Sequence, residues 1–423
     1  MTARGHHTDD GAPSTPLGCA RPRTVRGSRE SSRVALLTGA HDLSYALGLT
    51  GALVAEGISV DFIGSDSVDA PMLHESSLIR FLNLRGDQRE DVGLVTKVRR
   101  VTFYYLRLIR YAMEAEPRIF HILWNNKFEL FDRTLLMLFY KACGKRVVMT
   151  AHNVNAARRD GHDGLLNRLS LAIQYRLTDH LFVHTEKMAA ELESDFGVMR
   201  SKISVIPFGI NNTIPATGLT NSEARKRLGL HDADLTALFF GQIAPYKGLD
   251  YIVDALPGLM AWHRGFRLII AGKVKRGSEE YWRDIERRIA ALESPECVIR
   301  RIEHIPDSDV ETYFKAADVL VVPYREIFQS GVPFLAYSFG LPVIATDVGT
   351  LRDDVLEGRT GMVCRPRDPA DLARAIRDHF ESDLHASIGE TREAIRRFAN
   401  ERYSWAKVGS ITGSIYRKLL AHA

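Results

Sequence analysis

The sequence predicts an α/β protein made of two Rossmann-like, doubly wound domains that face each other across a cleft. Short apolar runs alternate with helix-like stretches along most of the chain, and the alternation restarts after a connector that begins near residue 208. With 423 residues, the chain also exceeds the roughly 250 to 300 residues at which a single core stops growing. Both observations indicate two packed domains.

The strand patterns of the two domains can be read in order along the chain. In the first domain, they lie at residues 33–37, 58–64, 119–123, 146–150, 180–184 and 203–207. In the second domain, they lie at 237–240, 266–271, 298–300, 319–323 and 342–346. Because helix-like stretches separate these strands, each domain is expected to form a parallel sheet. We place the domains at 33–207 and 208–402, with a helix in the terminal segment 403–423.

Composition limits the partners and the location. Residues 1–32 are nearly free of bulky apolar side chains, so we expect a disordered N-terminal lead. A net charge of +4 gives no electrostatic case for nucleic acid, while anionic small molecules and anionic lipid stay open. The four cysteines are scattered without metal-type spacing, which predicts reduced thiols and no metal site. With no apolar run long enough to span a bilayer, we expect a cytoplasmic protein.

The most informative segment runs from residue 329 to 349. A polar loop leads to a short helix opened by Ser330 and Gly331, followed by a glycine stop, an apolar strand and a glycine-bearing loop. Backbone N–H groups at such a helix start favour an anion, which predicts a phosphate-bearing ligand. A buried βα unit without a ligand explains the segment equally well.

Three side chains are candidates for ligand binding or catalysis, and each also has an ordinary structural explanation. Lys247 follows a strand and suits a diphosphate, although a lysine before glycine is usually a solvated turn residue. His152 closes an apolar strand and could orient a substrate, or could merely bond to backbone. Glu326 could accept hydrogen bonds from sugar hydroxyls, or could be a solvated loop carboxylate. Asp353 and Asp354 carry the same ambiguity.

The segment 97–115 combines basic residues with aromatic and aliphatic residues at helical spacing. A basic amphipathic helix of this kind can lie on anionic lipid. A helix packed on the core, with arginines that only reach to water, is the favoured interpretation.

Taken together, these features resemble the retaining GT-B glycosyltransferases of the large group 1 family, which use nucleotide sugars to build polysaccharides, lipopolysaccharide and glycolipids. The likeness covers nearly everything from Arg33 onward. It rests on the Gly-x-Ile-x-Pro-Tyr-Lys-Gly element at 241–248, the strand and turn at 268–272, His304-Ile305-Pro306, the strand at 317–324, the segment 330–349 and Gly358-Arg359-Thr360-Gly361.

The resemblance implies roles for particular residues. Lys247 would bind the donor diphosphate, and His152 and Glu326 would lie beside the transferred sugar. The remaining donor-site positions are Gly39 and Ala40 in the first domain, and Gly241, Gln242, Gly272, Lys273, Ile305, Ser330, Gly331 and Val332 in the second. The first domain would bind the acceptor, the second would bind the nucleotide sugar, and the final helix would pack back on the first domain.

The chain departs from the family pattern at two places. Gln242 stands where family members usually carry an arginine, so one positive charge on the diphosphate is missing. Of two family glutamates separated by seven residues, Glu326 lies at or next to the first position, whereas Phe334 or Leu335 occupies the second. The carboxylate contact to the ribose is therefore expected to be absent.

The resemblance implies a hexosyltransferase without cofactor or metal, which moves a sugar from a nucleotide sugar to a glycan or lipid-linked acceptor, with retention at the anomeric carbon. The expected location is the cytoplasm, extending to peripheral contact with the inner face of the plasma membrane. A GT-B epimerase or phosphorylase is the enzymatic alternative. A catalytically degenerate protein that only binds sugar nucleotides is the other.

Overall fold

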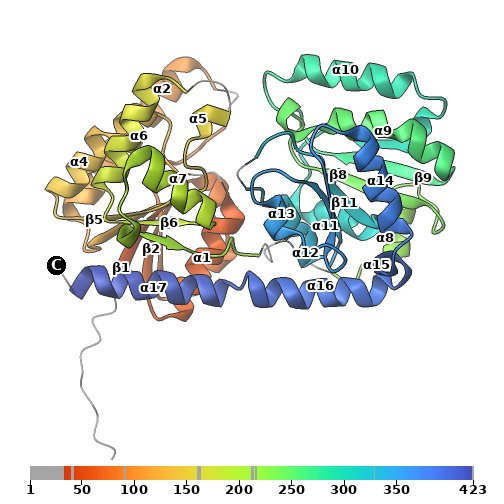
Figure 1. Cartoon of the computed structure of the whole chain (residues 1–423). Helices are drawn as coiled ribbons and strands as arrows, with labels where there is room; N and C mark the ends of the chain where they lie inside the picture. Colours follow the sequence, from red (N-terminus) through yellow and green to blue (C-terminus); the bar gives the residue numbers. More distant parts are fainter. Residues whose placement is uncertain are drawn as a thin grey trace, which may run out of the picture. The chain divides into compact units, whose positions relative to one another are not determined.

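The computed structural model describes residues 33–39, 42–89, 92–159, 163–210, 214, 217–327 and 329–421 of the chain. These residues form two sheets of seven and six strands, and every strand pair is parallel (Figure 1). The expected α/β class with two doubly wound halves is therefore confirmed. The predicted disordered lead, residues 1–32, lies outside the described residues.

The first sheet has the strand order β3-β2-β1-β4-β5-β6-β7. Its strands are β1 (Arg33–Leu37), β2 (Ser59–Gly64), β3 (Ile79–Asn83), β4 (Ile119–Ile122), β5 (Arg146–Thr150), β6 (His180–Val183) and β7 (Ile203–Val205). The central strands β2, β4 and β6 are buried along their whole length, because helices cover both faces of the sheet. This is why they appear in the sequence as short apolar runs.

Alternate side chains of these strands enter two separate cores. On one face, Val34 and Phe62 pack with residues of α1 (Leu43–Ala55) and α17 (Trp405–Ala421). On the other face, Ala35 and Phe120 pack with residues of α2, α4, α6 and α7. The bounds of the other helices here are α2 (Leu94–Glu114), α3 (Glu129–Arg133), α4 (Leu135–Ala142), α5 (Ala156–Arg159), α6 (Leu165–Leu177), α7 (Glu186–Phe196), η1 (Asp66–Val68), η2 (Pro71–His74) and η3 (Arg200–Lys202).

The second sheet has the order β10-β9-β8-β11-β12-β13. Its strands are β8 (Leu235–Phe240), β9 (Phe266–Ala271), β10 (Val298–Arg301), β11 (Val319–Val322), β12 (Val343–Thr346) and β13 (Gly361–Cys364). Its helices are α8 (Asn221–Arg227), α9 (Leu249–Trp262), α10 (Glu279–Ala290), α11 (Asp307–Ala316), α12 (Val332–Ser338), α13 (Leu351–Asp354), α14 (Pro369–Phe380), α15 (Asp383–Ala386), α16 (Ile388–Arg402), η4 (Pro245–Lys247) and η5 (Pro295–Cys297). One face packs on α9, α10 and α14, and the other on α11, α12 and α16.

Both sheets reverse their strand order at one point. In the first sheet this point lies between β1 and β4, and in the second it lies between β8 and β11. Ligands of open parallel sheets bind outside the carboxyl ends of the strands at such a switch point. A ligand is therefore expected near the loops that follow these four strands.

Two strands are absent from the sequence prediction. The edge strand β3 is half-exposed and carries a charged Arg80, so it lacks the apolar run of a buried strand. The other, β13, has only four residues and begins with Gly361. The division between domains near residue 207 remains our proposal, based on the end of β7 at Val205 and the start of α8 at Asn221.

The final helix α17 packs against α1 of the first half, as the sequence resemblance implied (Figure 1). Three glycines make this contact close. A Cβ at Gly48 or Gly209 would lie 2.2 or 2.3 Å from the Trp405 ring, and a Cβ at Gly409 would lie 2.7 Å from the Ala52 carbonyl oxygen. Trp405 also donates its indole N–H to the Ile210 carbonyl at 2.8 Å. Separately, no helix in the described ranges is both long and apolar enough to cross a membrane.

Candidate functional site

A cavity of about 400 Å³ lies at the switch point of the second sheet, and we take it as the candidate site. Its polar lining comes from the loops after β8 and β11, which carry Lys247, Gln329 and Ser330, and from the start of α1, where Asp42 and Ser44 lie. The aromatic rings of Tyr45, Phe208 and Trp405 form the rest of the lining outside the second sheet, together with Gly209. The cavity thus combines one buried cation with an aromatic wall.

Lys247 ends the 3₁₀ turn η4 and is only 7% exposed. Its Nζ donates a hydrogen bond to the Tyr324 hydroxyl at 3.0 Å and lies 4.8 Å from the centre of the same ring. The Tyr324 hydroxyl is in turn 3.3 Å from Ser330 Oγ. This burial does not fit a solvated turn lysine, because such a side chain would extend into water. An ammonium held at a cavity wall can instead attract an anion.

Ser330, Gly331 and Val332 line the same cavity as Lys247. Ser330 Oγ accepts a hydrogen bond from the Val332 N–H at 3.3 Å. The helix that follows, α12, has only seven residues, and Pro333 in its first turn has no N–H to offer. The helix dipole is therefore a minor contributor, and Lys247 carries most of the positive charge at this wall.

Glycines bring the backbones of neighbouring strand ends together beside Lys247. Gly272 has a φ of +149°, and a Cβ there would lie 1.9 Å from the Gly241 carbonyl oxygen. Gly241 itself has a φ of +107°, and its missing Cβ would lie 3.5 Å from Lys247 Nζ. Both positions require glycine, because an L side chain would be strained and, at Gly272, would overlap backbone atoms.

His152 lies in a cluster of rings at the carboxyl end of β5. Its ring stacks on Trp124 with 4.4 Å between centroids and an angle of 5° between planes, and it meets the Tyr45 ring edge-on at 4.6 Å. Nδ1 of His152 is 3.1 Å from Nε2 of His184. Burial lowers the pKa of His184 to about 4, so that ring is neutral at physiological pH. Tyr45 lines the cavity, whereas His152 lies behind it.

Several predicted site residues lie away from this cavity. Glu326 and Gln242 are exposed, and neither lines the cavity, although Ile327 and Gln329 beside Glu326 do. The predicted donor-site positions Gly272, Lys273 and Ile305 also lie outside its lining, and Lys273 is exposed. At the second family glutamate position, Leu335 presents an apolar side chain to the cavity.

The remaining candidate residues are Gly39 and Ala40 in the first half and Asp353 and Asp354 in the second. Gly39 is buried at the end of β1 with a φ of +62°, and a Cβ there would lie 2.5 Å from Trp124 Cβ. Gly39 therefore lets Trp124 approach closely enough to stack on His152. Ala40 lies outside the described residues. Asp354 is buried and accepts a hydrogen bond from Thr350 Oγ1 at 2.8 Å, so it is a structural residue of α13, while Asp353 is exposed.

The aromatic wall and His184 were not predicted from the sequence. Tyr45, Phe208 and Trp405 come from segments far apart in the chain, and the Tyr45 ring lies 5.4 and 5.2 Å from the other two. No local sequence pattern predicts that residues so far apart in the chain come together. His184, by contrast, follows an apolar strand just as His152 does, and that signal could have found it. Within the described residues, no group of three or more His, Cys, Asp or Glu could hold a metal ion.

Comparison with protein families gives one match for each sheet. A model described as glycosyl transferases group 1 matches residues 234–382, which include the Lys247 loop and the segment after β11. A model described as glycosyltransferase family 4 matches residues 44–213 of the first half.

Similar curated proteins match part of the chain. A D-inositol 3-phosphate glycosyltransferase of Streptomyces avermitilis is 33% identical over 244 residues, which are 56% of this chain and 51% of the relative. A glycogen synthase of Mycobacterium tuberculosis is 30% identical over 275 residues, which are 64% of this chain and 62% of the relative. The chain thus spans about half to three fifths of the length of these relatives.

Solved structures match nearly the whole chain. A sucrose-phosphate synthase from Thermosynechococcus elongatus aligns with 93% of this chain and 100% of its own, with a TM-score of 0.72 and 20% identity. Anabaena HepE in complex with UDP-glucose aligns with 92% and 100%, with a TM-score of 0.68 and 14% identity. At these identities the likeness concerns the fold alone, and it confirms the expected GT-B architecture.

Proposed function

The chain belongs to the group 1, family 4 glycosyltransferases, and from that premise we propose that it transfers a sugar from a nucleoside diphosphate sugar to a hydroxyl of a glycan or lipid-linked acceptor. We propose retention at the anomeric carbon. The donor would occupy the Lys247 cavity, with its diphosphate on the cationic wall and its sugar toward the Tyr45 side.

The observation that carries this proposal is the buried ammonium of Lys247 at the switch point of the second sheet. Sugar transfer leaves a nucleoside diphosphate with an additional negative charge on its terminal phosphate. A cation already held in place, away from bulk water, stabilises that developing charge more than a solvated cation would. Catalysis would then come mainly from positioning and from stabilising the departing diphosphate.

The names of similar proteins guide the choice of substrates to test. HepE has been captured with UDP-glucose, and a starch synthase with ADP and acarbose. UDP-, GDP- and ADP-sugars are therefore the donors to screen by thermal shift, because a ligand that binds the native state raises the unfolding temperature by mass action. If none of them shifts the unfolding temperature, a nucleotide-sugar site is contradicted.

A second measurement separates an enzyme from a binding protein. The donor that gives the largest thermal shift would be supplied with its sugar radiolabelled, and release or transfer of the label would be followed over time. Turnover is expected. Tight donor binding without hydrolysis or transfer would instead support a catalytically degenerate protein, and a changed sugar on an intact nucleotide would support an epimerase.

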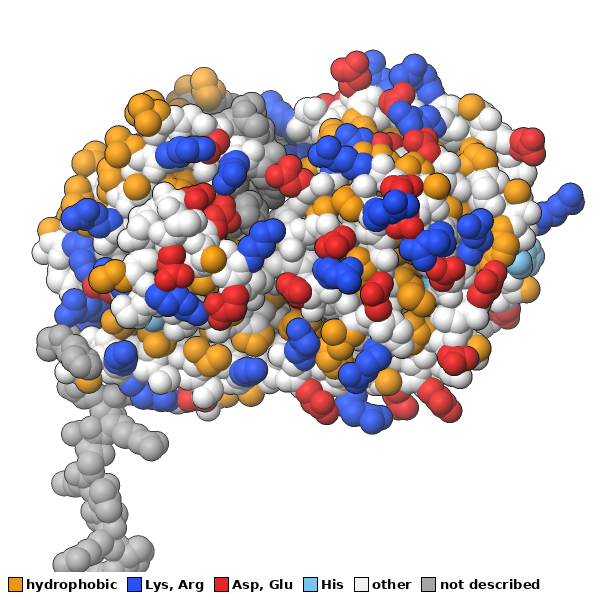
Figure 2. All heavy atoms as spheres, viewed as in Figure 1, with side chains coloured by type: hydrophobic (Ala, Val, Ile, Leu, Met, Phe, Trp, Pro, Cys, Tyr) orange, Lys and Arg blue, Asp and Glu red, His pale blue; other side chains and the backbone are white. Residues whose placement is uncertain are grey.

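We further propose that the first half rests on an anionic membrane surface at the cytoplasmic side. Large apolar side chains are exposed along α2, where Leu94 is 77% and Val95 83% exposed, and on α6, where Leu165 is 84% exposed. Figure 2 shows hydrophobic side chains gathered over the part of the first half where Figure 1 places α4 and α6. Exposed arginines on α2 add charge complementary to anionic lipid. α2 also buries Tyr104 and Leu108, so core packing and lipid contact use different faces.

Vesicle sedimentation tests this placement. Replacing Arg99, Arg107 and Arg110 with glutamine should weaken sedimentation with phosphatidylglycerol vesicles and leave the unfolding temperature unchanged. Arg100 is kept, because it pairs with Asp87 at 2.7 Å. Sedimentation equal to that of the wild type would contradict membrane contact through α2.

A further inference from the structure

A second cavity, of about 770 Å³, lies at the switch point of the first sheet. Gly39 after β1 and Asn126 after β4 line it, together with residues that follow β2 and β3 and one face of α2. It shares no lining residue with the Lys247 cavity. By the switch-point rule, this is a second place where a ligand would bind.

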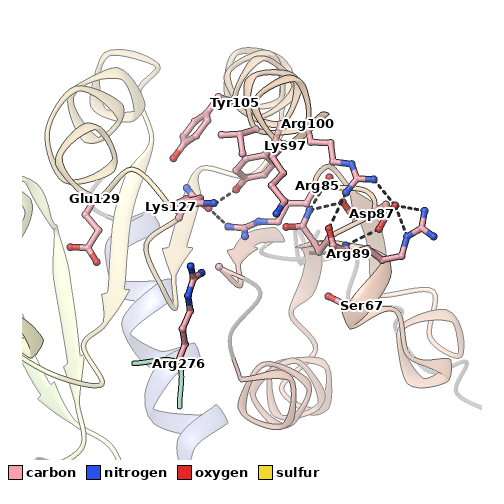
Figure 3. Close-up of a pocket in the computed structure, with 15 residues that line it drawn as sticks. Ser67, Arg85, Asp87, Arg89, Lys97, Arg100, Tyr105, Lys127, Glu129 and Arg276 are labelled. Atoms are coloured by element: carbon pink, nitrogen blue, oxygen red, sulfur yellow. Dashed lines mark hydrogen bonds and ion pairs between the residues drawn. The ribbon is translucent and has the colours of Figure 1, made fainter. Parts of the chain in front are cut away.

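Positively charged side chains predominate in the lining of this cavity. Six Lys or Arg residues line it, against two carboxylates, and both carboxylates already have partners. Asp87 pairs with Arg89 at 2.9 Å and with Arg100 at 2.7 Å, as the dashed lines in Figure 3 show. The other, Glu129, pairs at 2.7 Å with Arg133, which is not part of the lining.

Four cations of the lining have no ion-pair partner among the described residues, and these are Arg85, Lys97, Lys127 and Arg276. Figure 3 shows them on separate elements around the cavity, with Arg276 from the loop after β9. Cations gathered around a cavity without enough carboxylates repel one another. An anion with more than one charge would relieve that repulsion.

Arg85 is held in a defined position. Its guanidinium lies 4.6 Å from the centre of the Tyr104 ring and donates a hydrogen bond to Asn126 Oδ1. Asn126 Oδ1 also accepts from the Tyr104 hydroxyl at 2.6 Å, and Asn126 Nδ2 donates to Asp132 at 3.2 Å. A guanidinium fixed by an aromatic face and an amide loses little freedom when it binds a phosphate group through its other N–H donors.

From this geometry we infer that the cavity binds a phosphate or diphosphate group of the acceptor. The inference rests on the proposed transfer reaction, and it adds the chemical class of the second substrate. A single carboxylate would neutralise one of the four cations, whereas a phosphate monoester or a diphosphate carries two or more charges and several acceptor oxygens. The acceptor hydroxyl would then extend from this phosphate toward the Lys247 cavity.

Inorganic pyrophosphate is the probe for this site, measured by calorimetry on protein already saturated with the nucleoside diphosphate that binds best. A second pyrophosphate site is expected under these conditions. Lys97→Gln and Lys127→Gln should each weaken it about tenfold, since a hydrogen bond to a charged group contributes roughly 1.5 to 3 kcal/mol. Both side chains are at least partly exposed, so neither substitution should affect folding.

Arg99→Gln is the matched control. Arg99 is on the same helix as Lys97 and loses the same charge, but it is exposed outside the lining. Its pyrophosphate affinity should stay at the wild-type value. Absence of a second site, or equal weakening by Arg99→Gln, would overturn the inference. Because nucleoside diphosphate binding is measured first in the same cell, failure of the donor site is recognised separately.

Two sources of the phosphate can be told apart with vesicles. Phosphatidic acid carries a phosphate monoester, whereas phosphatidylglycerol carries a diester with a single negative charge, so the vesicle compositions are matched in total surface charge. If the acceptor is lipid-linked, phosphatidic acid vesicles should compete with pyrophosphate in the wild type, and phosphatidylglycerol vesicles should not. If neither competes while pyrophosphate binds, the acceptor is a water-soluble phosphate ester. Both lipids could instead compete equally with pyrophosphate, and continue to do so in the double variant Lys97→Gln/Lys127→Gln. That result would contradict a phosphate pocket.

Discussion

Tyr416 of the final helix α17 is hydrogen-bonded to His121 of β4, with 2.5 Å between Oη and Nδ1, although 295 residues separate them in the chain. The other ring nitrogen of His121 is 2.8 Å from Thr150 Oγ1 on β5. All three side chains are fully buried. Burial lowers the pKa of His121 to about 3, so the ring stays neutral and both of its nitrogens need partners. This link fastens the end of the chain to the centre of the first sheet.

Tyr416→Phe should therefore lower the free energy of unfolding by about 1 to 3 kcal/mol, because it leaves a buried ring nitrogen of His121 without a partner. Urea unfolding would measure the change. Tyr140→Phe is the matched control, since the buried Tyr140 hydroxyl has no hydrogen-bond partner among the described residues and its loss should cost little. Equal effects of the two substitutions would contradict a stabilising role for the link.

The buried histidines predict that stability rises with pH in the acid range. Burial lowers the pKa of His121 to about 3 and those of His180, His184 and His379 to about 4. Unfolded histidine has a pKa of about 6.5, so between about pH 4 and 6.5 the unfolded chain binds more protons than the folded protein. Each group then contributes up to about 1.4 kcal/mol per pH unit. A urea midpoint that stays constant or falls between those pH values would contradict this prediction.

Asp354 should act in the opposite direction. Burial raises its pKa to about 7, above the unfolded value of 3.8, so its contribution to stability is complete below the unfolded pKa and is lost as pH rises toward 7. Asp354→Asn removes the ionisable group and should raise the unfolding temperature relative to wild type more at pH 8 than at pH 5. An equal rise of the unfolding temperature at both pH values would contradict this assignment.

His152→Ala should reduce turnover strongly and leave nucleoside diphosphate affinity within a few fold. In the structure His152 packs between Trp124 and Tyr45, and Tyr45 lines the Lys247 cavity. Loss of the ring would therefore disturb the sugar end of the cavity rather than the Lys247 wall. Steady-state kinetics and calorimetry on the same variant check both parts. An equal loss of nucleotide affinity would contradict this placement.

The buried strands were predictable because helices cover both faces of each sheet, so that every residue of a strand such as β11 is apolar. The strand-end rule found Lys247, since a residue that follows a parallel strand lies at the ligand edge whatever the rest of the fold. The same rule predicted Glu326, which is not part of the cavity lining. It places a residue at the correct edge, but whether a loop side chain turns inward depends on neighbours such as Ile327, which occupies the wall instead.

The cationic cavity of the first sheet shows a second kind of feature that local sequence patterns do not predict. Lys97 and Arg100 were recognised as part of a basic helix, but Arg85 and Lys127 come from loops that have no shared pattern in the sequence. Their meeting depends on the order of β3, β1 and β4 in the sheet. Local spacing identifies which residues share a helix face, whereas a site assembled from four strand ends requires the topology first.

Lys247→Ala is the prediction that bears most directly on the donor site. Charge-assisted bonds to a desolvated diphosphate contribute about 1.5 to 3 kcal/mol, so nucleoside diphosphate affinity should fall roughly tenfold to a hundredfold or more. Gln242 is exposed and uncharged, so the position expected to hold a second cation offers no substitute. Calorimetry should be run with the nucleoside and the nucleoside diphosphate in turn, because the affinity for the nucleoside should barely change.

Lys247→Arg should not restore the affinity. Nζ donates a hydrogen bond to the Tyr324 hydroxyl at 3.0 Å and lies 4.8 Å from the centre of that ring, and a planar guanidinium reaches a phosphate from this position with a different geometry. Lys226→Ala, at an exposed lysine on α8, controls for the loss of one positive charge and should leave the affinity unchanged. If the diphosphate binds Lys247→Ala as tightly as wild type, the ammonium does not contact the phosphates. The donor would then have to bind elsewhere, and the second cavity, with its own four cations, would become the place to search for it.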